Sequence, residues 1–266
     1  MVMRPALINV MVKAAEKAGR GLLRDFGEVE HLQVSRKGPA DFVSTADLKA
    51  QKTLWEELSV ARPSFGFLAE EGDSGENKPD ANERWIIDPL DGTSNFLHGV
   101  PQWAISIGAE RNGEIIAGVV YNPVADELFW AEKGLGAYLN SQRLRVSARR
   151  ELADCLIGMG TPFKGSGRNY EVFTRELSAV MPLVAGVRRL GAAALDLAYV
   201  AAGRFDAFWE RGLKPWDVAA GYILVKEAGG FIESLEKGKD PIQTGDVLAS
   251  NTDVHDKMLK LLREAK

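Results

Sequence analysis

Apolar residues recur at helical spacing near the start of the chain. Positions 7, 10, 11, 14, 18 and 22 predict an amphipathic helix that ends near Gly27. Ser44-Thr45-Ala46-Asp47 is typical of a capped helix start, so a second helix is expected from there to about Ala61. The Gly-Pro pair within residues 37–41 predicts a loop between the two helices.

Shorter apolar runs follow, and these predict strands. A strand over residues 65–69 is expected to end at Glu70 and Glu71, before a polar stretch, 72–83, that is predicted as a mobile loop. An antiparallel meander is predicted over residues 104–107, 115–121 and 127–130.

The second half alternates apolar runs with helical patterns. Strands are expected near Leu156, Ala207 and Val247. Helices are expected over residues 169–181, 191–202, 215–228 and 254–265. The whole pattern predicts an α+β fold.

The segment Trp85 to Phe96, which contains Asp88-Pro89-Leu90-Asp91-Gly92, carries the main candidate chemistry. Residues 85–87 predict the end of a buried strand. Pro89 has no backbone N–H to donate to a neighbouring strand, so the strand is expected to stop at Asp88. Asp88 to Asp91 has the composition of a type I turn, which would direct both carboxylates at one point. Two carboxylates about 5 Å apart repel by roughly 3 kcal/mol at an effective dielectric near 20, so a cation or a proton must lie between them.

The possible ligands in this segment are all hard oxygen atoms. They are the two carboxylates, the Leu90 carbonyl and the Thr93 hydroxyl, without any histidine or cysteine, so Mg²⁺ or Mn²⁺ is favoured over zinc. Thr93 or Ser94 is expected to cap a following helical turn whose free N–H groups bind an anion. Metal ligands facing free N–H groups predict a phosphate site, whereas an isolated Asp-Gly pair is more often a surface turn.

A second acidic landmark is Lys214-Pro215-Trp216-Asp217. Pro215 suits the first position of a helix, so Asp217 lies in the first turn, either as a simple cap or as a ligand that points out of the helix end. Glu210 follows the strand predicted near Ala207 and, taken alone, has the character of a surface residue.

The charge and the apolar runs of the chain argue against nucleic acid and membrane as partners, and the single cysteine bears on the compartment. A net charge of −4, from 33 basic and 37 acidic residues, gives no overall basic field for nucleic acid, and no segment has the length and apolarity of a membrane span. Cys155 is the only cysteine and lies in an apolar run, so it is expected to be a buried small hydrophobe in a reducing compartment, the cytoplasm.

Other catalytic arrangements have little support in the sequence. A Gly-x-Ser-x-Gly elbow, a Walker A loop and a complete dinucleotide fingerprint are absent, and the three histidines have no evident Ser or Cys partner. An aspartyl-phosphate mechanism with Asp88 or Asp91 as the nucleophile ranks below metal binding, because the same carboxylates suit a cation better.

Three segments together resemble the signatures of the inositol monophosphatase family: Glu70-Glu71, Trp85 to Phe96, and Trp216 to Gly221. They occur in the family's order and spacing, and the resemblance spans nearly the whole chain. It implies alternating αβαβα layers of the sugar-phosphatase type, one catalytic unit with lobes of about residues 1–145 and 146–266, a homodimer, Mg²⁺ dependence and inhibition by Li⁺.

The resemblance also implies the metal ligands. Glu70, Asp88 and the Leu90 carbonyl would bind a first Mg²⁺, and Asp88, Asp91 and Asp217 a second. Glu70 would hold a third, weaker ion, so two to three ions are expected, with Mn²⁺ as a possible substitute.

Further roles follow from the same resemblance. Thr93, hydrogen-bonded to Asp47, would orient the metal-activated water for in-line attack on phosphorus, with the N–H groups of Gly92 and Thr93 on phosphate oxygens. Glu210 and the backbone of Gly191 to Ala193 would contact substrate hydroxyls, and Asp91 and Asp217 would border the substrate.

Two positions bear on the identity of the substrate. Many members have Ser or Thr where this chain has Ala192, which affects sugar recognition, and Ser94 favours the inositol branch over branches with a Lys-type residue there. The expected activity is hydrolysis of myo-inositol monophosphate or a related small polyol phosphate. Fructose 1,6-bisphosphate is an alternative substrate, and regulatory binding to the transcription machinery is an alternative of another class.

Overall fold

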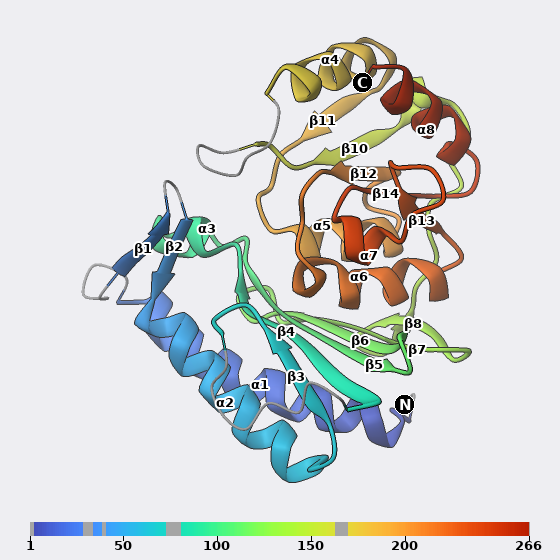
Figure 1. The fold of residues 1–266 in the computed structure, drawn as a ribbon. Coiled ribbons are helices and arrows are strands. Elements are labelled where there is room, and N and C mark those ends of the chain that lie inside the picture. Colours follow the sequence, from blue (N-terminus) through green and yellow to red (C-terminus); the bar gives the residue numbers. More distant parts are fainter. Residues whose placement is uncertain (1–2, 29–33, 39–40, 73–80, 163–169, 266) are drawn as a thin grey trace.

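The computed structural model describes residues 3–28, 34–38, 41–72, 81–162 and 170–265. Helices and sheets alternate in layers, with two sheets separated by one layer of helices and covered by further helices on their outer faces (Figure 1). This arrangement confirms the expected αβαβα layers.

A seven-stranded sheet occupies the N-terminal half. Its strands, in spatial order, are β3 (Gly66–Ala69), β4 (Glu83–Asp91), β5 (Ala104–Arg111), β6 (Glu114–Asn122), β7 (Glu127–Glu132), β8 (Gly136–Leu139) and β9 (Gln142–Arg143). β3 and β4 run parallel, and the other neighbours are antiparallel. The predicted meander is confirmed, and it continues into β8, which has only four residues, and the two-residue, polar β9, both too short to stand out in the sequence.

The two predicted N-terminal helices cover the outer face of this sheet. They are α1 (Ala6–Phe26) and α2 (Thr45–Ala61), and both predictions are confirmed. Met11 and Leu54 from these helices pack in one core with Trp85 and Ile107 of the sheet, and all four side chains are fully buried. This core fixes β4 against the two helices.

The segment between the two helices departs from the prediction. β1 (Val34–Gly38) and β2 (Asp41–Ser44) pair as a short antiparallel hairpin, so the loop predicted over 37–41 falls partly on strand ends. Its centre, residues 39–40, lies outside the described residues, as do residues 73–80 of the loop predicted over 72–83.

A five-stranded mixed sheet occupies the C-terminal half. Its spatial order is β11 (Gly186–Arg188), β10 (Leu156–Met159), β12 (Ala207–Glu210), β14 (Val247–Ser250) and β13 (Phe231–Ser234). The helices around it are α4 (Tyr170–Val180), α5 (Ala193–Ala201), α6 (Pro215–Glu227), α7 (Pro241–Thr244) and α8 (His255–Glu264). The strands and long helices predicted here are confirmed. The short elements β11, β13 and α7 were not predicted.

Helices α5 and α6 lie between the two sheets, and α4 and α8 cover the far face of the five-stranded sheet (Figure 1). The close approach of α6 to the first sheet depends on Gly118. A Cβ atom there would lie 2.7 Å from the carbonyl oxygen of Ala220, so a side chain at this position would push the helix away. This packing brings the N-terminus of α6 to the end of β4.

Cys155 is buried as expected. Its Sγ donates a hydrogen bond to the carbonyl of Glu151 at 3.2 Å, and burial raises the pKa of the thiol to about 11. Among the described helices, none combines the length and apolarity that a membrane crossing requires.

Candidate active site

A bulge in β4 brings Asp88 and Asp91 to one place. Asp88 pairs with Ser106 of β5 and Asp91 pairs with Ala104. The two aspartates are three residues apart on β4, whereas their partners are only two residues apart on β5, so β4 contains one extra residue. Oδ1 of Asp88 accepts a hydrogen bond from the N–H of Leu90 at 2.9 Å inside the bulge. The prediction that the strand stops at Asp88 is therefore wrong. Pro89 falls within the bulge, where no ladder donor is needed, and β4 continues to Asp91.

Asp217 reaches the same place from α6. Ser106 is the β5 partner of Asp88, and its hydroxyl donates a hydrogen bond to the carbonyl of Trp216 at 3.0 Å. This bond fixes the start of α6 beside Asp88. Oδ2 of Asp217 accepts a hydrogen bond from the N–H of Lys214 at 2.7 Å, so this carboxylate caps its own helix and also lies at the cluster.

Asp88, Asp91 and Asp217 form one cluster of carboxylates. Each offers an oxygen atom, and the three oxygens lie within 4.8 Å of one another. Asp88 and Asp91 are buried, at 2% and 8% exposure, and Asp217 is half-buried. Within the described ranges no Lys or Arg forms an ion pair with any of the three. Among the described side chains, the cluster therefore gathers negative charge without a cation paired to it.

Burial raises the pKa of all three carboxyl groups. The pKa values of Asp88 and Asp217 lie well above their usual range, first because of burial and then because of neighbouring carboxylates. Burial raises the pKa of Asp91 only to about 7, because the backbone N–H of Ala194 stabilises its charged form. In the absence of a cation, the cluster thus holds protons at pH values where ordinary aspartates are ionised.

Asp91 connects the sheet to α5. Its Oδ2 accepts a hydrogen bond from the N–H of Ala194 at 2.7 Å. A Cβ atom at Gly92 would lie 3.3 Å from the Cβ of Ala192, so the start of α5 is adjacent to the Gly92-Thr93 segment. Gly191 forms the turn before the helix with a φ of +84°, and Ala192 and Ala193 are buried. The structure thus places residues 191–193 beside the cluster.

Thr93 and Asp47 form the hydrogen bond that the resemblance implied. Oγ1 of Thr93 lies 3.1 Å from Oδ1 of Asp47 and 3.0 Å from the carbonyl oxygen of Leu90. Asp47 is fully buried, and its Oδ2 accepts hydrogen bonds from the N–H and the hydroxyl of Ser44 at 2.9 and 2.5 Å. Ser44 is the N-cap of α2, so the start of this helix orients Asp47 towards Thr93.

The helical turn predicted after Asp91 is α3 (Thr93–Leu97), but its cap differs from the prediction. Gly92 is the N-cap, with a φ of +93°, and no side chain caps the helix. The carbonyl oxygen of Gln102 lies 2.9 Å from the Cβ position of Gly92, which excludes a larger residue there. Neither Thr93 nor Ser94 is the cap, and the Thr93 hydroxyl is instead directed at Asp47 and Leu90.

Glu70 follows β3, at the edge of the cluster. Its N–H donates a hydrogen bond to the carbonyl of Ile87 at 3.2 Å, and its charge contributes to the raised pKa of Asp88. Glu70 is half-buried and is not one of the three residues whose ligand atoms converge. The expected position at the strand end is confirmed, while its place in a metal site stays a prediction.

Gln51 supports the turn that carries Glu70 and was not singled out in the sequence. It lies on the buried face of α2 with 1% of its surface exposed. Its Oε1 accepts a hydrogen bond from the N–H of Glu71 at 3.0 Å, and its Nε2 donates one to the carbonyl of Gly72 at 2.9 Å. A polar residue at a core position of an amphipathic helix is the signal that could have indicated it.

Glu210 ends β12 as predicted and is half-buried. Its charge contributes to the raised pKa of Asp91, Asp217 and Asp196, which places it near the cluster.

Asp196 is a carboxyl group that sequence reasoning missed. It is 1% exposed, and its Oδ1 has no hydrogen-bond partner within the described part of the chain. An acidic residue in the otherwise apolar helix 193–201 is the signal for it.

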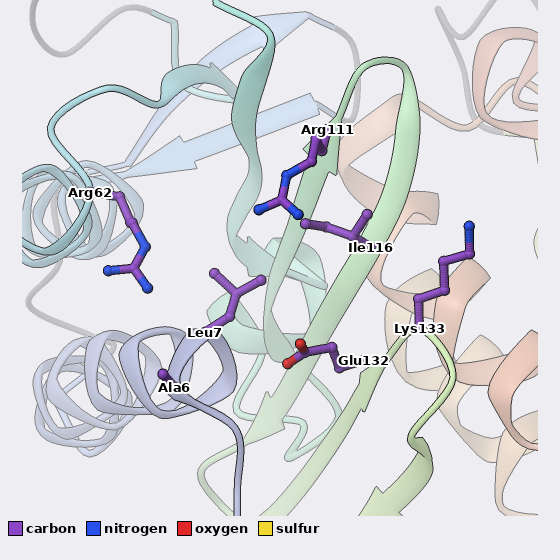
Figure 2. Close-up of a pocket in the computed structure, with 7 residues that line it drawn as sticks. All are labelled: Ala6, Leu7, Arg62, Arg111, Ile116, Glu132 and Lys133. Carbon is purple, nitrogen blue, oxygen red and sulfur yellow. The ribbon is translucent and has the colours of Figure 1, made fainter.

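A pocket of about 420 Å³ lies elsewhere, where the start of α1 meets the ends of α2 and of strands β5 to β7. Its lining residues are Ala6, Leu7, Arg62, Arg111, Ile116, Glu132 and Lys133 (Figure 2). Two of its cations are already paired, Arg111 with Glu83 at 2.6 Å and Lys133 with Glu114 at 2.5 Å. None of the predicted site residues lines this pocket, so it is separate from the carboxylate cluster.

The cluster suits a hard divalent cation. Its donors are carboxylate oxygens, and within the described ranges no His or Cys joins them and no Lys or Arg pairs with them. Mg²⁺ and Mn²⁺ prefer such oxygen ligands, whereas zinc prefers nitrogen and sulfur. The fold and the site thus define a layered α+β protein with a candidate centre for divalent cations.

Comparison with known proteins gives the family. A profile of the Inositol monophosphatase family matches residues 4–266. Inositol-1-monophosphatase of Mesorhizobium japonicum is 56% identical over 261 residues, which cover 98% of this chain and 97% of the relative. The Nus factor SuhB of Pseudomonas aeruginosa is 42% identical over 92% of each chain. The crystal structure of the extragenic suppressor protein suhB from Bartonella henselae superposes with a TM-score of 0.92 at 53% identity, covering 98% of this chain and 99% of that one. The chain belongs to the inositol monophosphatase family.

Proposed function

We propose that this protein is a Mg²⁺-dependent phosphomonoesterase that hydrolyses myo-inositol monophosphate or a related small polyol phosphate. The observation that carries the proposal is the convergence of three carboxylates, within 4.8 Å of one another and without an ion pair to any Lys or Arg of the described residues, beside the hydrogen-bonded pair of Thr93 and Asp47. Family membership supports a phosphatase, and relatives that share more than half of the sequence are named inositol-1-monophosphatases.

In this proposal the carboxylates hold two or three cations. Asp88, Asp91 and Asp217 are the central ligands, and Glu70 and the Leu90 carbonyl complete the set. Bound Mg²⁺, or Mn²⁺ in its place, supplies charge neutralisation at the phosphate and lowers the pKa of a water molecule.

Thr93 orients the attacking water. Its single hydroxyl proton points either to Asp47 or to the Leu90 carbonyl, since both acceptors lie about equally near. When the proton is donated to Asp47, the free lone pairs of Oγ1 accept a hydrogen bond from the water and direct its oxygen at phosphorus. The N–H groups of Gly92 and Thr93 hold phosphate oxygens, on which negative charge grows during in-line displacement.

Glu210 and the start of α5 select the substrate hydroxyls. Glu210 accepts hydrogen bonds from them, and the backbone of Gly191, Ala192 and Ala193 contacts them. Asp91 and Asp217 border both the metals and the substrate. The catalytic unit is thus shared between two lobes, about residues 1–145 and 146–266.

Replacing Glu210 by Gln tests whether the substrate is a polyol. Gln keeps the shape but weakens the acceptor, and a hydrogen bond with a charged partner is worth roughly 1.5 to 3 kcal/mol, so kcat/KM for myo-inositol 1-phosphate should fall about ten- to a hundredfold. Para-nitrophenyl phosphate offers no hydroxyl to Glu210 and should show a much smaller loss. Steady-state kinetics on both substrates measure this, and equal losses would mean that Glu210 only supports the site.

A panel of phosphate esters tests the substrate class. Phosphate release is measured at saturating Mg²⁺ from inositol monophosphates, fructose 1,6-bisphosphate, adenosine bisphosphate and histidinol phosphate. We expect the highest kcat/KM on inositol monophosphates. A preference for fructose 1,6-bisphosphate would assign the sugar-phosphatase alternative instead.

The relationship to a Nus factor favours one further candidate, a regulatory protein that binds the transcription machinery. Capture from lysate with the wild type and with a metal-site variant separates the two roles. A binding role that uses the surface alone would survive loss of the metal ligands, whereas phosphatase activity would not. The homodimer and the inhibition by Li⁺ that the resemblance implies, and the cytoplasmic location expected from the single buried cysteine, belong to the same proposal.

A further inference from the structure

The carboxylate of Glu210 has very different neighbours on its two sides. β12 lies between β10, to which it is parallel, and β14, to which it is antiparallel. Across β14, Glu210 pairs with Val247, whose branched side chain is fully buried. Across β10, Met159 pairs with Trp209, and the N–H of Gly160 donates to the carbonyl of Trp209 at 3.1 Å, so Gly160 is the next residue beside Glu210.

Same-register neighbours on adjacent strands project to the same face of a sheet, about 5 Å apart. Glu210 therefore has a β-branched side chain on one side and no side chain on the other. The carboxylate of Glu210 lies on the side of Gly160. A Cβ atom built on Gly160 would lie 1.8 Å from Cδ of Glu210, 1.9 Å from its Oε2 and 2.3 Å from its Oε1, and these are its three nearest atoms.

We propose that Gly160 is a specificity-determining residue: the missing side chain is the space in which the carboxylate of Glu210 lies when it receives substrate hydroxyls. This inference rests on the proposed function, in which Glu210 selects a polyol. Gly160 makes no contact with the reacting phosphate in this account, so it acts through Glu210 as a positioning residue.

The geometry also explains why the position can be tested without loss of the fold. The φ of Gly160 lies outside the left-handed region, so alanine meets no backbone strain there. The atoms that the new Cβ would meet belong to the far end of a flexible side chain rather than to backbone. Gly160→Ala should therefore displace the carboxylate while the two strands stay paired.

The test compares Gly160→Ala with the wild type on myo-inositol 1-phosphate and on para-nitrophenyl phosphate at saturating Mg²⁺. The ratio of kcat/KM for the inositol ester to kcat/KM for the nitrophenyl ester should fall by about ten- to a hundredfold. The fall should come mainly from a higher KM for the inositol ester. In the Glu210→Gln background, the same substitution should change that ratio little, because the charged acceptor whose position it alters has already been replaced by a weaker one. Gly21→Ala is the matched control, since nothing lies within 4 Å of its Cβ position, and should leave both activities unchanged.

A crystal structure of the Gly160→Ala variant gives a second readout, in which we expect the Glu210 carboxylate at a new position. The inference is overturned if the wild type hydrolyses both esters and Gly160→Ala leaves the ratio unchanged, or if the losses in the two single variants simply multiply. It is also overturned if the variant fails to fold, because Glu210 would then be unable to move aside. A wild type that hydrolyses neither ester, or only the nitrophenyl ester, contradicts the proposed function itself and the inference with it.

Discussion

Asp88→Asn and Asp91→Asn are each expected to lower Mg²⁺-dependent turnover by at least about a hundredfold, comparable to the loss of a major electrostatic element of an active site. Each change removes a charge that balances the cations and keeps the volume of the side chain. Asp91→Asn also keeps an oxygen for the N–H of Ala194. Turnover of myo-inositol 1-phosphate at several Mg²⁺ concentrations measures the effect, with the exposed Asp256→Asn as a control.

The same substitutions should stabilise the metal-free protein. Burial raises the pKa of Asp91 to about 7, so the folded state holds its proton more tightly than the unfolded state does. Stability linked to this group is fully present below pH 4 and is lost as pH rises from about 4 to 7. At pH 8 without metal, Asp91→Asn should therefore raise the free energy of unfolding by about 1 to 3 kcal/mol and flatten its pH dependence.

Urea unfolding in EDTA at pH 5 and pH 8 measures this change. With saturating Mg²⁺ the wild type should instead be more stable than Asp91→Asn, because the cation stabilises the wild type through its ligands and the variant has lost one ligand. Near wild-type, Mg²⁺-dependent turnover in both Asn variants would contradict the assignment of the cluster. A metal-free Asp91→Asn protein less stable than the wild type at pH 8 would contradict the account of its charge.

Thr93→Ala is expected to lower kcat about a hundredfold with a smaller change in KM, since positioned proton transfer typically contributes a hundredfold or more. The substitution removes the hydroxyl that links the attacking water to Asp47 and leaves the carboxylate cluster intact. Thr53→Ala is the matched control, because its hydroxyl donates only to the carbonyl of Lys49 within α2. Single-turnover kinetics separate the chemical step from binding.

The stereochemical outcome distinguishes this mechanism from an aspartyl-phosphate route. One displacement by water inverts the configuration at phosphorus and leaves no phosphorylated protein. Retention with a chiral phosphate ester, or a trapped phosphate on Asp88 or Asp91, would establish the covalent alternative.

Much of the site could be predicted because its residues lie in short segments with strong local signals. Asp88 and Asp91 follow an apolar run, Asp217 follows a proline at the first position of a helix, and Asp47 follows a Ser cap. Each signal depends on backbone geometry within a few residues. The convergence of the segments could not be derived from any of them alone, and it was the family resemblance that joined them.

The remaining features depend on contacts between distant segments. The bulge in β4 could not be predicted because it is defined by register against β5, and the N-cap at Gly92 depends on the approach of the Gln102 carbonyl. Gln51 interrupts the apolar face of its helix, but the turn that it supports is set by tertiary contacts, and Gly160 has ordinary sequence surroundings, so its importance follows only from the carboxylate beside it. Residues that support the site were therefore harder to predict than residues that form it.

The most direct test of the central claim is phosphate release from myo-inositol 1-phosphate by the purified wild-type protein, measured while Mg²⁺ is titrated from zero in a chelator-treated sample. We expect no release without the cation, a saturable rise as Mg²⁺ is added, and no such rise in Asp88→Asn. Release that is independent of divalent cations, or equal in the wild type and Asp88→Asn, would contradict the claim that these carboxylates hold a catalytic metal.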